Sequence, residues 1–165
     1  MVGQYPSMLL DHAKIPFEDV RFDFADWPSY KEKFEFKQMP ALEITDANGK
    51  VTQYTQSISI LRYLSLKNGY YPTDDAELAW EIDSALAAVY DLGTGLSTIL
   101  WERNPEKRAK NAEVFLKGVY IITLKALSER LAKNGTKFLA ADKLTSGDFL
   151  FGSFVVSFIY NDLRE

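Results

Sequence analysis

The chain contains no cysteine and only one histidine, His12, among its 165 residues. Without thiols it cannot form disulfide bonds, thiolate metal sites or a cysteine nucleophile, although this absence says little about its cellular compartment. A single histidine excludes a self-contained histidine-rich metal site, and a Ser-His-Asp triad would have to use His12. We therefore predict no metal site and assign no catalytic residue on these grounds.

The sequence also lacks an excess of positive charge and a long apolar run. The 19 Lys and Arg residues against 23 Asp and Glu residues give a net charge of -4, which disfavours nucleic acid and anionic membranes as partners. The longest apolar run, "FLFGSFVVSFI" at 149–159, is about half of the length that spans a bilayer. No basic, apolar leader opens the sequence. We predict a buried helix there, no membrane span, and a cytoplasmic location, with an organellar one left open.

The composition that remains is that of a globular protein, because 47% of the residues are hydrophobic and 25% are charged. The first seventy residues mix helical and strand periodicity. In chain order, the pattern predicts a helix at 7–14, a strand at 17–24, a helical turn at 29–34, strands at 39–44 and 50–54, and a helix at 56–68. The later two strands are joined by "TDANG", where Asn48-Gly49 supplies the positive φ angles of a tight hairpin.

From residue 73 onward the pattern is helical only. It predicts helices at 74–103, 104–134 and 149–160, the last one after the capping box Thr145-x-x-Asp148. The inward faces of the first two helices are predicted to contain Leu78, Ile82, Leu86 and Val89, and Ala112, Phe115, Val119, Ile122 and Ala126. The sequence therefore predicts two domains, a mixed domain at 1–70 and an all-helical domain at 74–165.

The pair Gln56-Ser57 lies where a predicted strand passes directly into a helix. The first turn of a helix leaves backbone N–H groups without partners, and its dipole favours negative charge, so a carboxylate or phosphate can bind there. A serine hydroxyl and a glutamine amide would add further donors. The alternative is that both residues only cap the helix, which is their common role at such positions.

Three other positions are candidates for the same site. Met39-Pro40 opens a strand, and a cis bond there would leave the backbone of Met39 free to pair with an extended ligand, although trans is the default for an X-Pro bond. Trp27 and Lys31 could offer an indole N–H and an ammonium group to a second carboxylate, or Trp27 could simply pack. Asp91, on the first long helix, is most simply a solvated acidic residue.

Five stretches, taken in order and at their spacing, resemble the glutathione transferase family, most closely its sigma-like class: "IPFEDVRF", "DWPSYK", "QMPALEI", "TQSISILRYL" and "KFLAADKLTSGDF". The resemblance covers nearly the whole chain. It implies an α+β protein with a thioredoxin-like N-terminal domain, incomplete here, followed by an all-helical C-terminal domain. It also implies homodimers that use glutathione as co-substrate and a small-molecule electrophile as the second substrate.

The resemblance also implies roles for residues in the first half of the site. Trp27 and Lys31 would reach the glycyl carboxylate of glutathione, with Gln38 nearby. Met39, before a cis Pro40, would pair its backbone with the cysteinyl unit.

The remaining implied contacts involve the other end of the tripeptide. Gln56 and Ser57 would hold the γ-glutamyl carboxylate, and Asp91 would reach the γ-glutamyl amine across the dimer. Thr145 and Asp148 match the capping box of the family, which is structural.

The chain also departs from the family pattern. The family begins with a strand that carries a catalytic tyrosine, whereas this sequence starts at about the first helix, and Tyr5, beside Pro6, is not assigned that role. Helices beyond the last one are missing too. Three explanations stay open: a fragment of a longer protein, a gap filled by another polypeptide, or a rebuilt domain.

Three functions follow from these observations. The chain is a glutathione transferase that conjugates electrophiles or isomerises lipid-like substrates, a catalytically inactive interaction subunit of a larger assembly, or a protein of the same fold in which glutathione has no role.

Overall fold

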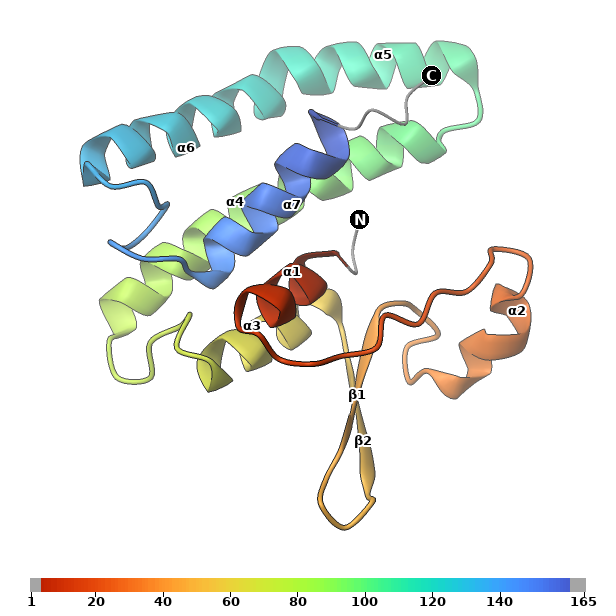
Figure 1. Ribbon diagram of the computed structural model, residues 1–165. Coiled ribbons are helices and arrows are strands. Elements are labelled where there is room, and N and C mark those ends of the chain that lie inside the picture. Colours follow the sequence, from red (N-terminus) through yellow and green to blue (C-terminus); the bar gives the residue numbers. More distant parts are fainter. Residues whose placement is uncertain (1–3, 161–165) are drawn as a thin grey trace. The chain divides into compact units, whose positions relative to one another are not determined.

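The computed structural model describes residues 4–160, and the chain divides into two compact units, Met1–Tyr70 and Tyr71–Glu165 (Figure 1). The first unit is mixed α and β, and the second is all-helical. The first unit contains α1 (Gln4–His12), α2 (Trp27–Tyr30), the 3-10 turn η1 (Lys31–Lys33), β1 (Ala41–Thr45), β2 (Val51–Thr55) and α3 (Ser57–Lys67). The second contains α4 (Ala76–Trp101), α5 (Pro105–Phe115), the π-helical turn η2 (Leu116–Tyr120), α6 (Ile121–Asn134) and α7 (Ser146–Phe158).

Strands β1 and β2 form an antiparallel hairpin in which Ala41 lies opposite Thr55 and Thr45 lies opposite Val51. The Asp46 carboxylate closes the turn by accepting the N–H groups of Asn48 and Lys50 at 2.8 and 2.9 Å. Gly49 has a φ of +79°, which a residue without a side chain adopts at no steric cost. The predicted hairpin turn is confirmed, but only Gly49 of the Asn-Gly pair has a positive φ, and the prediction of one at Asn48 is wrong.

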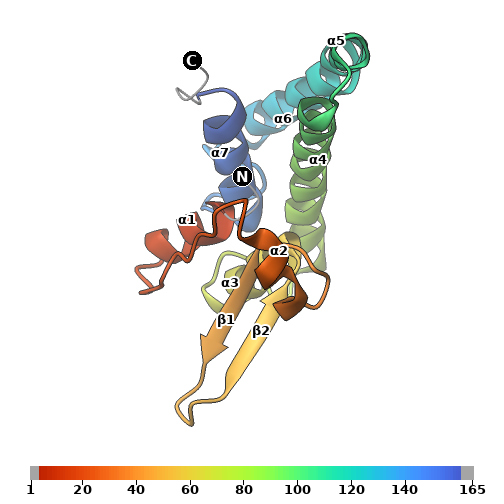
Figure 2. The same cartoon turned by 90° about the vertical axis from the view of Figure 1, so that its right-hand side faces the viewer.

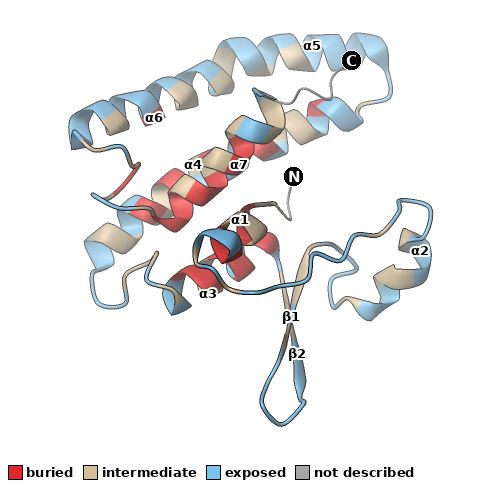
Figure 3. Cartoon of the chain, viewed as in Figure 1, coloured by how far each residue is buried: buried red, intermediate tan, exposed pale blue. Residues whose placement is uncertain are grey.

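Helices α1 and α3 pack together to form the core of the first unit. Their apolar residues recur at helical spacing, so that each helix buries one face. Figure 3 shows these buried faces in red, while the hairpin and the α2 region are exposed or half-buried. The core residues on the two helices are Tyr5, Leu9, Leu10, Ile60, Leu61 and Leu64.

The predicted strand at 17–24 is wrong. Residues 15–23 have no regular secondary structure, and Phe17, Val20 and Phe24 are 43%, 60% and 80% exposed. A strand is stable only when its backbone groups pair with a neighbour. In the described part of the chain the sheet contains β1 and β2 alone, so the alternating pattern at 17–24 has no ladder to join.

In the second unit α7 packs along α4, as Figures 1 and 2 both show. The predicted stripe of α4 is confirmed at Ile82, Leu86 and Val89, which are at most 2% exposed. Its first residue, Leu78, is half-buried. Three helix starts are capped by side chains. The Asp75 carboxylate accepts the Leu78 N–H at 2.8 Å, Asn104 Oδ1 accepts the N–H groups of Glu106 and Lys107, and Thr145 and Asp148 form the predicted capping box.

The predicted inward face of the helix at 104–134 is correct in its first part and wrong in its second. Ala112 and Phe115 are half-buried, but Val119 and Ile122 are 54% and 67% exposed, and Ala126 is exposed as well. The wider π-helical turn at η2, with non-helical angles at Gly118, breaks the 3.6-residue period. After the turn Leu127 is the residue that faces inward, at 4% exposed.

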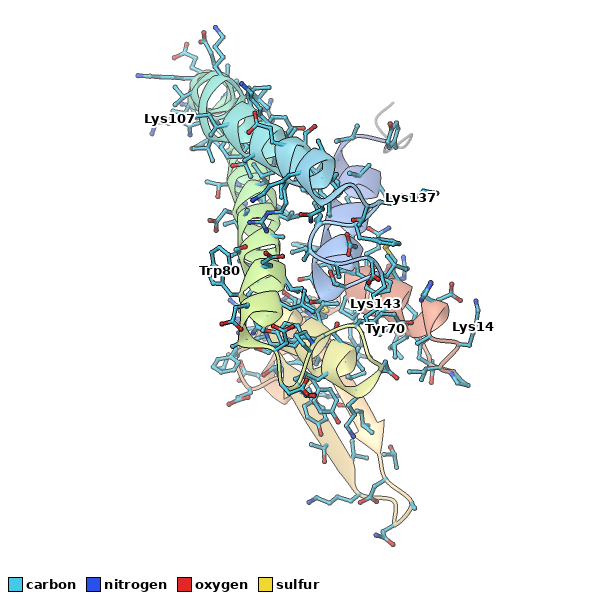
Figure 4. All side chains as sticks on the ribbon, turned by 90° about the vertical axis from the view of Figure 1, so that its left-hand side faces the viewer. Lys14, Tyr70, Trp80, Lys107, Lys137 and Lys143 are labelled. Atoms are coloured by element: carbon cyan, nitrogen blue, oxygen red, sulfur yellow. The ribbon has the colours of Figure 1, made fainter. Side chains whose placement is uncertain are left out.

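No helix in the described residues is both long enough and apolar enough to cross a membrane. Large apolar side chains do remain in solvent on the second unit, and Trp80, which projects from α4 at 67% exposure, is labelled in Figure 4.

Candidate functional site

The strand-to-helix junction at Gln56-Ser57 has the geometry of an anion site. Gln56 has a φ of +66° and a ψ of 109°, which turns the chain sharply between β2 and α3 without a glycine. The first intrahelical bond runs from the Ile60 N–H to the Gln56 oxygen at 2.9 Å, and no side chain caps α3. The N–H groups of residues 57–59 therefore have no partner within the helix, and the helix dipole adds a partial positive charge at this point.

A positive φ at a residue other than glycine is energetically unfavourable and often marks a functional position. The side chain of Gln56 is exposed, so packing of that side chain does not explain the conformation. Ser57, by contrast, is only 8% exposed. The junction thus combines an exposed amide, a nearly buried hydroxyl and free backbone donors, which together suit a carboxylate.

The register of the hairpin brings a second candidate to the same place. Because Ala41 pairs with Thr55 at the end of the ladder, the next residue on each strand, Pro40 and Gln56, flanks the same end of the hairpin. The Met39-Pro40 peptide bond is cis. Met39 is 43% exposed, so this segment is accessible to a ligand beside the start of α3.

The loop that carries Trp27 and Lys31 is tied to this end of the hairpin. The Thr55 hydroxyl donates a hydrogen bond to the Glu35 carboxylate at 3.1 Å. Within the loop the ring centroids of Trp27 and Phe34 lie 5.5 Å apart. Phe22, just before the loop, has its ring centroid 4.3 Å from that of Tyr30. These aromatic contacts give the loop a small core of its own.

The charges of the loop leave the ammonium group of Lys31 available. Glu32 is paired with Lys37 at 2.8 Å, whereas Lys31, half-buried at the start of η1, has no acidic partner among the described residues. Gln38 is exposed between this loop and Met39. A second carboxylate could bind at Lys31.

Seven of the eight predicted site residues lie in the first unit, along the loop at 27–40 and the junction at 56–57. The eighth, Asp91, is exposed on α4 in the second unit. Sequence reasoning missed Glu35 and Thr55, which fasten the loop to the hairpin. The Asn-Gly turn sets the register of the hairpin, and this register could have placed Thr55 at the end of the hairpin beside α3. Among residues 4–160, no group of three or more acidic or histidine side chains could hold a metal ion.

Comparison with known proteins gives one family for both units. A family model described as "Glutathione S-transferase, N-terminal domain" matches residues 4–65, and one described as "Glutathione S-transferase, C-terminal domain" matches residues 90–164. The chain is 37% identical to Glutathione S-transferase 2 of Manduca sexta over 146 residues, which are 88% of this chain and 68% of that protein.

Two solved structures are similar over nearly the whole chain. Prostaglandin synthase D of Nilaparvata lugens has a TM-score of 0.83 at 28% identity, with 94% of this chain and 75% of that chain covered. A sigma class enzyme of the same family from Fasciola hepatica has a TM-score of 0.83 at 25% identity, with 99% and 79% covered. The predicted sigma-like resemblance is confirmed, as is the predicted fold of a thioredoxin-like domain followed by an all-helical one.

Proposed function

This chain belongs to the glutathione S-transferase family, and on that premise we propose that its first unit binds glutathione as co-substrate for conjugation to small electrophiles. The observation that carries the proposal is the junction at Gln56-Ser57, with its uncapped helix start beside the cis Met39-Pro40 bond. Glutathione is a tripeptide with a carboxylate at each end, and two separate anion sites in one unit match that pattern.

We assign the γ-glutamyl carboxylate to the start of α3. The N–H groups of residues 57–59 and the Ser57 hydroxyl would donate to its oxygens, and Gln56 would add its amide. The backbone of Met39 would pair with the cysteinyl unit, because Met39 is 43% exposed and lies just before the start of β1.

We assign the glycyl carboxylate to the loop at 27–38. The Lys31 ammonium would pair with it, the Trp27 indole N–H would donate to it, and Gln38 would lie nearby. Asp91 would bind the γ-glutamyl amine of the glutathione molecule held by the neighbouring protomer. A homodimer is therefore part of the proposal. Light scattering on the purified chain tests that state.

Calorimetry with glutathione tests the binding proposal. Ser57→Ala removes one donor to a carboxylate and should weaken binding by about 1.5 kcal/mol, or about tenfold in Kd. Ser59→Ala is the matched control, because Ser59 lies in the same helical turn but is exposed. Glutathione at about a millimolar concentration detects even weak binding. If the folded chain released no binding heat at that concentration, the proposal would be contradicted.

Conjugation requires more than binding, because the thiolate is the nucleophile and a free thiol is mostly protonated at neutral pH. We assign no catalytic residue to this chain. Kinetics with a generic electrophile therefore decide whether it conjugates glutathione above the uncatalysed rate. Isomerisation of a lipid-like substrate is the second reaction to assay, and cell fractionation tests the proposed cytoplasmic location.

A second candidate function is that of a catalytically inactive interaction subunit. The exposed apolar residues Phe17, Val20 and Phe24 favour it, as does a sheet of only two strands in the described residues, because open strand edges and apolar surface attract partners. This candidate predicts no turnover and association with another polypeptide. A stable, monodisperse monomer would contradict it.

A further inference from the structure

A hydrogen bond between side chains joins the loop at 27–40 to the last residue of β2. The Thr55 hydroxyl donates to the Glu35 carboxylate at 3.1 Å. Thr55 is half-buried and is followed directly by Gln56 and Ser57 at the start of α3. The bond therefore attaches the loop to the hairpin next to the uncapped helix start.

The segment from Lys31 to Lys37 is held together by its own contacts. The Phe34 N–H donates to the Lys31 oxygen at 3.2 Å, and the Lys37 N–H donates to the Phe34 oxygen at 2.9 Å. The Lys37 ammonium also pairs with the Glu32 carboxylate at 2.8 Å. These contacts hold Lys31 in a fixed relation to Glu35.

The connection from Lys31 through Glu35 to Thr55 links the two anion sites of the proposed function. Lys31 belongs to the site in the loop, and the N–H groups of residues 57–59 belong to the site at the start of α3. The chain also joins the loop to the hairpin through residues 38–40, but these lie outside the β1–β2 ladder. The hydrogen bond between side chains therefore fixes the span between the sites.

The charge of Glu35 does not explain its position. Its carboxylate is exposed and lies on the connection between two sites that suit anions. A negative charge there repels a ligand that carries carboxylates, so Glu35 does not attract glutathione electrostatically. Its contribution is the hydrogen bond that holds the loop.

We propose that Glu35 is a positioning residue that makes the site selective for the length of glutathione. This inference rests on the proposed function, because it requires both carboxylate contacts. Glu35 does not touch the ligand. By accepting the Thr55 hydroxyl it keeps Lys31 at one distance from the start of α3. A ligand with two carboxylates binds both sites only if its length matches that distance, and otherwise the loop must be displaced.

Calorimetry on the full chain with three ligands tests the proposal. The first is glutathione, and the second is its homologue with β-alanine in place of glycine, which is one methylene longer. The third is γ-glutamylcysteine, which lacks the second carboxylate. The unsubstituted chain should bind glutathione several-fold more tightly than the β-alanine homologue.

Two substitutions on different elements break the hydrogen bond. Thr55→Val removes the hydroxyl but keeps the branched shape, and Glu35→Ala removes the acceptor. Each should raise the Kd for glutathione about two- to fivefold and bring it close to the Kd for the β-alanine homologue. The Kd for γ-glutamylcysteine should not change. Circular dichroism verifies the fold of each variant, and either one alone suffices for the test.

Conservative variants separate positioning from charge. Glu35→Gln keeps an oxygen that accepts the Thr55 hydroxyl, and Thr55→Ser keeps the hydroxyl, so both should retain the preference for glutathione. Glu43→Ala is the matched control. Its carboxylate accepts a hydrogen bond from the Gln53 side chain at 3.1 Å in the middle of the ladder, and its loss should leave all three Kd values unchanged.

Three outcomes would overturn this inference and leave the proposed function standing. They are equal affinity of the unsubstituted chain for glutathione and the β-alanine homologue, a preference that Thr55→Val and Glu35→Ala do not change, and an equal loss of affinity for all three ligands in these variants. If the unsubstituted chain bound none of the ligands, the proposed function would be overturned, and this inference with it.

Discussion

Phe115 of α5 lies directly against the backbone of Gly95 in α4. A methyl group at Gly95 would lie 2.6 Å from Cζ of Phe115 and 3.0 Å from its Cδ2 atom, so the ring occupies the space that any side chain would need. Helix α5 has no fully buried residue, and it passes close to α4 at this point. The absence of a side chain at Gly95 thus allows α5 to remain packed on α4.

We predict that Gly95→Ala destabilises the protein. Overlap with Phe115 should cost up to about 3 kcal/mol, against a gain in helix propensity of about 1 kcal/mol when alanine replaces glycine. The net loss of stability should therefore reach about 2 kcal/mol. Urea unfolding measures the difference. Gly147→Ala is the matched control, because a methyl group there would meet its nearest neighbours, the Ala85 Cβ and the Ile82 oxygen, at 3.6 Å, which is ordinary contact. If Gly95→Ala cost the same in a Phe115→Ala background, the overlap would not be its cause.

We predict that Asp148→Ala destabilises the second unit. The Asp148 carboxylate accepts the Thr145 N–H at 2.9 Å, the Thr145 hydroxyl at 2.8 Å and the Leu139 N–H at 2.8 Å. The substitution removes a helix cap and leaves the N–H group of the buried Leu139 without its acceptor, at a cost of about 1–3 kcal/mol. Asp142→Ala, at an exposed acidic residue in the preceding segment, should change the free energy of unfolding by less than about 0.5 kcal/mol. Equal effects of the two substitutions would contradict the prediction.

Features set by neighbours in the chain could be read from the sequence. The hairpin turn depends on Asp46, Asn48 and Gly49, which act within five residues, and the inward face of α3 follows a regular period. The strand predicted at 17–24 failed because alternation shows only that a segment suits a strand, whereas pairing depends on a second segment elsewhere. The predicted inward face was wrong in η2 and α6 for a local reason, since a single π-helical turn at Gly118 shifts every later residue.

The same distinction applies to the candidate site. The anion-binding character of Gln56-Ser57 could be inferred because a helix start leaves free N–H groups whatever the fold. The hydrogen bond from Thr55 to Glu35 could not, because it joins residues twenty positions apart. Its existence depends on how the loop returns to the hairpin, which no local pattern specifies.

We predict that Lys31→Met weakens glutathione binding by about 0.5–1 kcal/mol, the size of a partly exposed ion pair, and so raises Kd about two- to fivefold. The effect should disappear with γ-glutamylcysteine, which lacks the glycyl carboxylate. Calorimetry with both ligands measures it. Lys33→Met is the control, because Lys33 lies over the Tyr30 ring in the same turn. An equal loss of affinity for both ligands would assign Lys31 a different role.

We predict that Tyr54 of β2 and Tyr63 of α3, whose ring centroids lie 4.5 Å apart in a stacked arrangement, make the stability of the protein depend on alkaline pH with a defined sign. The pKa of Tyr63 is lowered in the folded protein by the hydrogen bond from Tyr54, so between that pKa and the ordinary value of 10.0 the unfolded chain binds more protons at this site. Stability from Tyr63 therefore rises with pH across this window and is lost as pH falls through the folded pKa. The raised pKa of Tyr54 has the opposite effect. Above pH 10.0 the folded chain binds more protons at Tyr54 than the unfolded chain does, so the free energy of unfolding falls as the pH rises.

Together the two tyrosines contribute most to the free energy of unfolding near pH 10. Each contribution can be removed separately by substitution. Tyr54→Phe takes away the donor, so the Tyr63 pKa should move up toward its ordinary value, and the phenolate absorbance of the folded protein should begin to rise at a higher pH than in the unsubstituted chain. Tyr63→Phe should leave Tyr54 without its acceptor and remove the early phase altogether. The Lys67 Nζ lies 5.4 Å from the centroid of the Tyr63 ring and lowers the pKa of Tyr63 less than Tyr54 does. Lys67→Met should therefore raise that pKa in the same direction as Tyr54→Phe, by a smaller amount. An early phase that survives Tyr63→Phe would place the acidic phenol at another tyrosine and contradict the prediction.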